Sequence, residues 1–163
     1  MISKSLVHAV NEQIKNEIDS AYLYLAMSAY CESVNLPGTA HWLRTQWQEE
    51  LGHAMKLAGM LYDRGGRVLF QAIEKPTAEF KSAKDIFQKV LSHEQKVTEL
   101  IHQLYATAVK EKDYAVQVEL QWFIKEQVEE EKSAGDILNQ LQLIGDSGSL
   151  LLMLDRQLGA RGK

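Results

Sequence analysis

Acidic and amide residues interrupt the apolar row of each of four long segments with helical periodicity. Steps of three and four residues keep side chains on one helix face, so such a row faces the core of a helical bundle. The residues that occupy apolar positions in these rows are Glu17, Glu50, Glu94, Gln127 and Glu130. One such residue would ordinarily be a partly exposed side chain, but recurrence in four segments argues against that explanation. The pattern predicts a bundle that buries polar groups at its centre.

Prolines and clustered glycines divide the chain into helices. The segments predicted to be helical are about 5–34, 39–63, 83–111 and 114–144, with a short apolar helix at about 148–159. The short break before residue 39 predicts that the first two helices form an antiparallel hairpin. Residues 67–82 contain Pro76 and have poor helical periodicity, which predicts a long crossover. We therefore expect an all-α protein with one domain, residues 1–163, in which a four-helix bundle at about 5–144 precedes the short fifth helix.

The buried polar positions have the same spacing in the two halves of the chain. Glu17 and Glu50 stand 33 residues apart, and so do Glu94 and Gln127. A further potential ligand follows three residues later, His53 in the first half and Glu130 in the second. Three residues are close to one helical turn, so the His53 ring can reach the same centre as the Glu50 carboxylate. Because the second half has no histidine at this place, the two halves should form chemically unequal metal positions.

Four buried carboxylates require a counter-charge. Burying an unpaired carboxylate costs several kcal/mol, and four of them would consume a stability that is typically about 5–15 kcal/mol. Two divalent cations would neutralise the four glutamates, while His53 and Gln127 would add neutral polar groups. A carboxylate-rich site with one imidazole suits iron or manganese, whereas structural zinc or copper favours thiolates or several histidines. This chemistry favours iron, and the candidate reaction is the oxidation of Fe(II).

Composition limits the partners and the location of the protein. The chain has 163 residues, of which 45% are apolar, enough for one substantial core. A net charge of −4 leaves no broad basic face for nucleic acid and favours the attraction of cations. We find no pattern of a secretory signal and no apolar stretch that could span a bilayer. Because Cys31 is also the single cysteine, we expect a cytoplasmic protein that binds neither membrane nor nucleic acid.

Four stretches resemble the bacterial and archaeal non-haem ferritins, and the resemblance covers essentially the whole chain. They are EIDSAYLYL at 17–25, EELGHAM at 49–55, RGGR at 64–67 and EQVEEE at 126–131. The resemblance implies the ferritin-like up-down-down-up four-helix bundle with one long crossover. It implies that Glu17, Glu50 and His53 hold one iron, and that Glu50 bridges to a second. Glu94 and Glu130 would hold that second iron.

The same resemblance implies an activity and an assembly. The di-iron centre would be a ferroxidase that oxidises Fe(II) to Fe(III) with O2 or H2O2. Its product would be stored as ferric mineral inside a hollow shell of twenty-four identical subunits. The C-terminal residues 150–154, with the sequence LLLML, are apolar on too many sides for an isolated surface helix, so we expect other copies to bury them. No haem is expected, because Leu51 stands where the haem-binding relatives carry a methionine.

Other residues near the predicted irons are candidates for supporting roles. By the resemblance Gln127 would lie beside the irons, and we include it among the candidate metal-binding and catalytic residues. Tyr24, two turns from Glu17, would donate an electron or a hydrogen bond to a metal-bound oxygen, although a buried tyrosine is ordinarily a packing residue. Trp122 points away from the row of its helix, so packing is the favoured role. The other histidines have no matching partner spacing and are unassigned.

Three glutamates beside the row positions, Glu49, Glu126 and Glu129, are ordinarily interpreted as solvated surface charges. By the resemblance they would, with Glu130, form a third iron site between the centre and the inner surface of the shell. Two other functions stay open at this point. One is a passive iron-binding shell without effective ferroxidase activity. The other is a di-metal oxygenase, which would need an apolar substrate pocket beside the metals.

Overall fold

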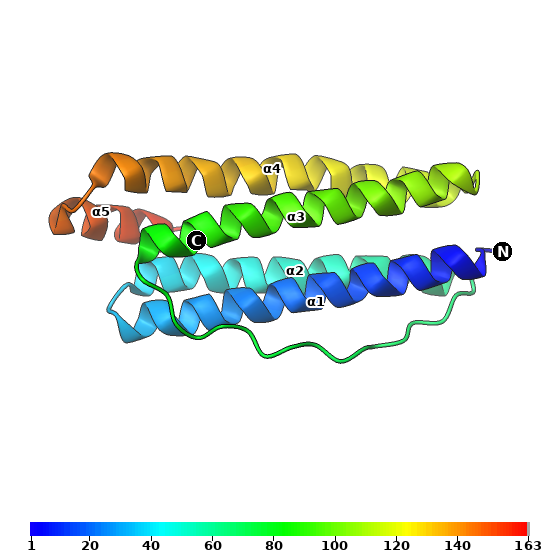
Figure 1. Ribbon diagram of the computed structural model, residues 1–163, viewed down its shortest axis with the longest axis horizontal. Helices are drawn as coiled ribbons and strands as arrows, with labels where there is room; N and C mark the ends of the chain where they lie inside the picture. Colours follow the sequence, from blue (N-terminus) through cyan, green and yellow to red (C-terminus); the bar gives the residue numbers. More distant parts are fainter. Residues whose placement is uncertain (163) are drawn as a thin grey trace.

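The computed structural model describes residues 1–162, which form five α-helices and no strand. The helices are α1 (Lys4–Ser33), α2 (Pro37–Asp63), α3 (Ala83–Lys110), α4 (Tyr114–Ile144) and α5 (Gly148–Leu158). The α1–α2 and α3–α4 pairs are antiparallel hairpins, and residues 64–82 cross back along the bundle so that α3 runs parallel to α2 (Figure 1). This order confirms the predicted up-down-down-up bundle with a short fifth helix. None of the helices within residues 1–162 has the length and apolar character needed to cross a membrane.

Local capping chemistry sets the helix ends. A serine or aspartate side chain accepts a hydrogen bond from a backbone N–H three residues later at the start of four helices, which satisfies an otherwise unpaired donor. These caps are Ser3, Ser82, Asp113 and Ser147. α2 begins instead with Pro37, whose missing N–H costs nothing in the first turn. The α2 start was predicted two residues late because Pro37 and Gly38 were assigned to the break before the helix.

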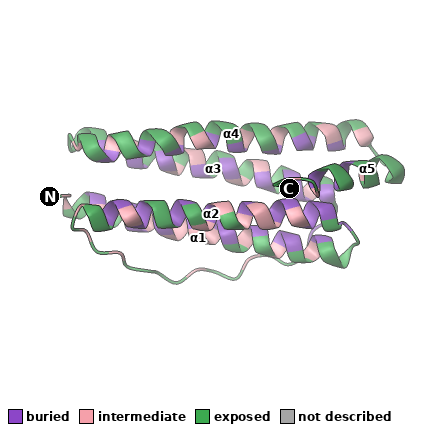
Figure 2. Cartoon of the chain, turned by 180° about the vertical axis from the view of Figure 1, so that it is seen from behind, coloured by how far each residue is buried: buried purple, intermediate pink, exposed green. Residues whose placement is uncertain are grey.

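A polar layer divides the apolar core into two clusters. One cluster, which includes Leu6, Leu57 and Leu120, fills the end of the bundle that contains the N-terminus. The other, which includes Met27 and Phe87, fills the end near α5. Buried residues lie along the inward faces of all the bundle helices (Figure 2). The intervening buried polar residues therefore lie between two large apolar clusters, which exclude water from both sides.

α5 is fixed to the start of α2 by a buried aspartate. Asp155 accepts hydrogen bonds from the backbone N–H of Gly38 at 3.0 Å, and from the N–H and hydroxyl of Thr39, both at 2.7 Å. A Cβ at Gly38 would lie 1.7 Å from the Asp155 carbonyl oxygen, so this close approach requires glycine. Leu150, Leu152 and Met153 remain exposed on the other side of α5.

Candidate metal centre

Glu17, Glu50 and His53 meet in the middle of the bundle. All three side chains are buried, and each offers a ligand atom that lies within 4.8 Å of the other two. His53 Nδ1 is 3.5 Å from Glu50 Oε2 and 3.8 Å from Glu17 Oε2. Within residues 1–162, this is the one group of three or more acidic, histidine or cysteine side chains that is so closely spaced. Two carboxylates and one imidazole are a donor set that suits a divalent transition metal such as iron.

Glu94 and Glu130, from α3 and α4, are buried beside this group and are held by hydrogen bonds. The Tyr24 hydroxyl donates to Glu94 Oε1, and Gln127 Nε2 donates to Glu94 Oε2 at 3.0 Å. Gln46 Nε2 donates to Glu130 Oε2 at 2.7 Å. Each carboxylate keeps lone pairs free for a cation while a neutral donor fixes its orientation. The second half of the centre thus consists of two carboxylates positioned by a phenol and two amides.

Burial and mutual repulsion change the protonation of the centre. Burial is the main cause that raises the pKa values of Glu50 and Glu94, and it raises that of Glu130 to about 7, with the Glu94 charge adding to the effect on Glu130. Burial lowers the pKa of His53, but hydrogen bonds with Glu17 and Glu50 outweigh it and bring the value to about 10. The metal-free centre therefore retains protons, which a bound cation would displace.

Tyr24 of α1 and Trp122 of α4 each contact a different ligand, Glu94 and His53 respectively. Tyr24 is fully buried, and burial raises its pKa well above the ordinary value, so the phenol stays protonated and donates to Glu94. The Trp122 ring is 38% exposed, in keeping with its position away from the row, yet its centroid lies 5.3 Å from that of His53, edge to face. Both rings touch a ligand side chain, and their roles in the chemistry remain predictions.

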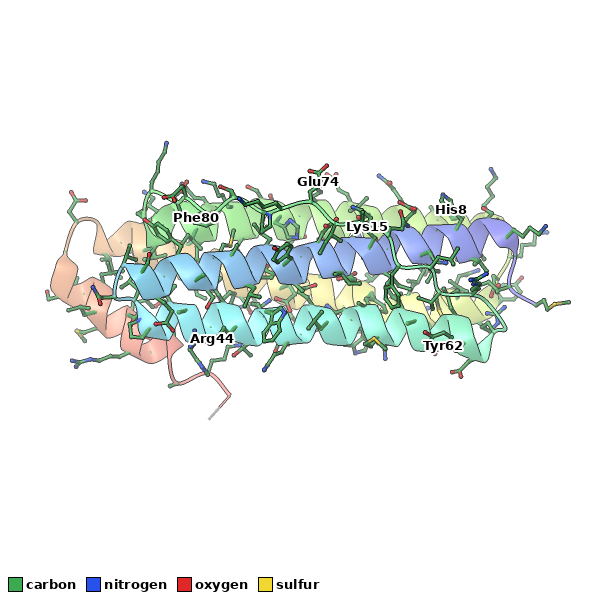
Figure 3. All side chains as sticks on the ribbon, turned by 90° about the horizontal axis from the view of Figure 1, so that it is seen from below. His8, Lys15, Arg44, Tyr62, Glu74 and Phe80 are labelled. Atoms are coloured by element: carbon green, nitrogen blue, oxygen red, sulfur yellow. The ribbon has the colours of Figure 1, made fainter. Side chains whose placement is uncertain are left out.

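The other histidines lie outside the group. His8 is on the outer surface of the bundle, with its side chain 77% exposed (Figure 3). His41 Nε2 lies 2.8 Å from the carbonyl oxygen of Arg161, and His93 Nε2 lies 2.7 Å from the Ser20 hydroxyl. His102 is exposed. Two of these histidines face solvent and two contact groups that are not proposed ligands, so all four remain unassigned.

The residues of the predicted third iron site are more exposed than those of the centre. Glu126 is half-buried and Glu129 is exposed, and the Glu49 carboxylate forms an ion pair with Arg161 Nη2 at 2.7 Å. The Glu49 charge is close enough to Glu130 to add to the rise in the Glu130 pKa, after burial and the Glu94 charge. The guanidinium of the C-terminal segment therefore neutralises a carboxylate that the third site would need. Iron binding at Glu49, Glu126 and Glu129 remains a prediction.

Sequence analysis missed two glutamines that hold the ligands. Gln13 Nε2 donates to Glu17 Oε1 at 2.7 Å, while Gln46 donates to Glu130, and both glutamines are buried. Each stands four residues before a ligand of its own helix, Glu17 or Glu50, one turn along the same face. A glutamine at this repeated position is the signal that could have identified them.

Comparisons with known proteins agree with this geometry. The family described as ferritin-like domain matches residues 7–144. A bacterial non-heme ferritin of Staphylococcus aureus is 38% identical over 161 residues, covering 99% of this chain and 97% of that protein. A probable bacterial non-heme ferritin-like protein of Haemophilus influenzae is 38% identical over 98% of this chain and 96% of its own length. An open pore ferritin from the hyperthermophilic archaeon Archaeoglobus fulgidus has a TM-score of 0.98 and 49% identity, with 99% of both chains covered.

Proposed function

Because this chain belongs to the ferritin family of iron-storage proteins, we propose that it oxidises Fe(II) to Fe(III) at the buried centre and stores the product. The observation that carries the proposal is the group Glu17, Glu50 and His53, with its ligand atoms within 4.8 Å of one another. The buried carboxylates of Glu94 and Glu130 lie beside it. Together these five side chains offer two adjoining cation positions in a water-excluded layer of the bundle.

In this proposal the two iron positions share one carboxylate. Glu17 and His53 would hold the first iron, Glu94 and Glu130 would hold the second, and Glu50 would serve both. Four carboxylates carry the charge needed to balance two divalent cations, which removes the electrostatic cost of burying them. Gln127 and Tyr24 donate hydrogen bonds to Glu94 and so set its orientation without occupying a coordination position.

The carboxylate-rich ligand set also explains why oxidation is favoured. Anionic oxygen ligands stabilise the more highly charged Fe(III) relative to Fe(II), so they make electron loss from the bound iron more favourable. Each Fe(II) gives up one electron. Two electrons and two protons reduce O2 to H2O2, or reduce H2O2 to two molecules of water. Protons displaced from the buried carboxyl groups and His53 on iron binding are available to balance this reduction.

The proposal includes storage inside a cytoplasmic shell of twenty-four subunits. The exposed apolar side chains of Leu150, Leu152 and Met153 on α5 support burial of this helix against other copies. Asp155 holds α5 against the start of α2, so these apolar side chains have a fixed position on the surface of the chain. Oxidised iron would leave the centre past Glu126 and Glu129, where we place the third iron site, and Glu49 would join that site when Arg161 releases it.

An oxygenase would require an apolar cavity beside the metals. A cavity of about 620 Å³ lies instead between α1 and the crossover, where Tyr22, Tyr30 and Pro76 are among its lining residues. Its lining contains none of the five proposed ligands. This cavity gives no support to oxidation of an organic substrate at the centre.

The test compares wild type with Glu94→Ala and with Glu99→Ala, an exposed glutamate on the same helix. Each metal-free protein is loaded anaerobically with Fe(II) and mixed with O2 in a stopped-flow instrument, while ferric absorbance is followed. We expect Glu94→Ala to slow the initial oxidation by more than about 10-fold, because it removes a ligand, and Glu99→Ala to match wild type. Retained iron per particle is then measured. The proposal would be contradicted if oxidation were slow and had the same rate in Glu94→Ala as in wild type. It would also be contradicted if wild type retained only about two irons per chain.

A further inference from the structure

Gln127 presents the nitrogen end of its amide to the second half of the centre. Its Nε2 donates to Glu94 Oε2 at 3.0 Å and to the Glu94 backbone carbonyl at 3.2 Å, and it contacts Thr98 Oγ1 at 3.4 Å. The amide nitrogen is a donor and offers no lone pair to a cation, whereas the amide oxygen would be a good ligand for iron. The orientation of one amide therefore decides whether Gln127 supports a ligand or becomes one.

Shape alone does not fix this orientation. A half-turn of the terminal amide exchanges its oxygen and nitrogen with little change in volume, so the neighbouring hydrogen bonds must select one arrangement. The two Glu94 oxygens select the nitrogen end because they only accept, and Thr98 reinforces the selection because its hydroxyl donates to Glu131 Oε1 at 2.5 Å. A hydroxyl has one proton to give and a carboxylate only accepts. With its proton committed to Glu131, Thr98 can only accept from Gln127, which requires the nitrogen end.

This arrangement belongs to the α3–α4 half alone. Thr98 and Glu131 stand four residues after Glu94 and Gln127, one helical turn further along each helix. The corresponding positions four residues after Glu17 and Glu50 are alanines, and both are buried. The polar pair is thus a specific feature of the half that lacks the histidine.

We propose that Thr98 and Glu131 are positioning residues that hold the Gln127 amide as a donor to Glu94 and keep its carbonyl oxygen away from the second iron. The inference rests on the di-iron centre proposed above. Its consequence is an unequal centre, since the first iron gains the neutral nitrogen of His53 and the second gains no neutral protein ligand. The second position is then the weaker one, from which oxidised iron leaves for the store.

Co(II) is a suitable probe, because its visible absorption weakens as its coordination number rises, as it would if the Gln127 oxygen became a ligand. The variant Thr98→Val keeps the shape and charge of the side chain and removes the hydroxyl, and Thr98→Ser retains the hydroxyl as the matched control. In Thr98→Val the amide nitrogen loses one of its three acceptors, so the amide turns its oxygen to the metal more readily. We expect the second Co(II) to bind about 10-fold more tightly, with weaker visible absorption, while the first is unchanged. Thr98→Ser should keep the wild-type affinity and spectrum.

If Thr98 had a purely structural role, its loss should weaken the binding of the second Co(II). Weaker or unchanged binding of the second Co(II) in Thr98→Val would therefore overturn the inference. If Thr98→Val does not assemble, Glu131→Ala provides the second test, with Glu119→Ala on the same helix as the charge control. Loss of Glu131 frees the Thr98 proton for the amide oxygen, so the Co(II) spectrum should again weaken, and an unchanged spectrum would contradict the inference. Failure of wild type to bind two Co(II) per chain would contradict the proposed function itself, and this inference with it.

Discussion

The two halves of the metal centre share a residue spacing but hold their ligands in different ways. In the α1–α2 half, Glu17, Glu50 and His53 lie directly against one another, with His53 Nδ1 within 3.8 Å of both carboxylates. In the α3–α4 half, Glu94 and Glu130 are each held by neutral hydrogen-bond donors. The first half is a compact ligand group, while the second is a pair of oriented carboxylates.

The difference also shows that the second half depends on the first. Two of the donors that orient the α3–α4 carboxylates come from the other hairpin, Tyr24 from α1 and Gln46 from α2. The donor to Glu17, by contrast, is Gln13 of the same helix. A repeated spacing in sequence therefore produces an asymmetric site, because the side chains one turn away from the ligands are different in the two halves.

The largest effect should follow from Glu50→Gln, which removes the carboxylate shared by the two halves. We expect both metal positions to weaken by more than about 100-fold, since the bridging charge is lost from each. The stability of the metal-free protein should not fall, because burial raises the pKa of Glu50 and makes its ionised form unfavourable in the fold. Calorimetric Co(II) titration and thermal unfolding measure the two quantities. Loss of only one position would show that Glu50 does not bridge.

A smaller and one-sided effect should follow from replacing the supporting glutamines. Gln46→Leu removes the donor to Glu130 and should weaken the second metal position by about 10-fold while leaving the first unchanged. Gln13→Leu removes the donor to Glu17 and should have the reverse pattern. The two variants are each other's control in the same Co(II) titration. Equal effects of both variants on both positions would remove the distinction between the halves.

Tyr24→Phe tests whether the phenol serves the second half through its hydroxyl or through packing. The ring stays in place, and the hydrogen bond to Glu94 is lost. We expect a fall in the initial rate of Fe(II) oxidation of about 10-fold, with assembly and thermal stability close to wild type. Stopped-flow absorbance measures the rate. A wild-type rate would assign Tyr24 to packing alone.

The smallest effect concerns the link between the two hairpins at the far end of the bundle. Arg64, just after α2, forms paired hydrogen bonds at 2.9 and 2.8 Å with Asp113, the N-cap of α4. The guanidinium lowers the pKa of Asp113 below its ordinary value. This stabilisation is therefore present above pH of about 4 and is lost as the pH falls through the folded-state pKa.

Asp113→Asn keeps an N-cap side chain and removes the charge, so the variant isolates the ion pair. We expect a loss of about 1 kcal/mol in the free energy of unfolding at pH 7. The loss should disappear at strongly acidic pH, where wild type is also protonated. Urea unfolding at the two pH values gives the comparison, and a difference that did not depend on pH would assign the effect to capping.

The helices and the five proposed ligands could be predicted from the sequence. Apolar residues recur every three or four positions on a buried helix face, so a glutamate at one of these positions is conspicuous, and His53 follows one of them by three residues. The supporting hydrogen bonds could not be predicted in the same way. Gln46 lies in the apolar row of α2 but serves Glu130 of α4, and that pairing depends on the rotation of α2 against α4. The contact of Arg161 with Glu49 is equally remote in sequence, since it requires α5 to turn back along α2. Such partners are set by packing between elements and not by periodicity within one.

Anomalous diffraction from crystals soaked anaerobically in Fe(II) tests the central claim most directly, because it locates each iron relative to the two halves. The account predicts two iron peaks per chain, one contacting Glu17 and His53 and the other contacting Glu94 and Glu130, with Glu50 between them. Gln127 should lie outside coordination distance of both. A single peak, or two peaks on the α1–α2 side with Glu94 and Glu130 uncoordinated, would contradict the proposed centre.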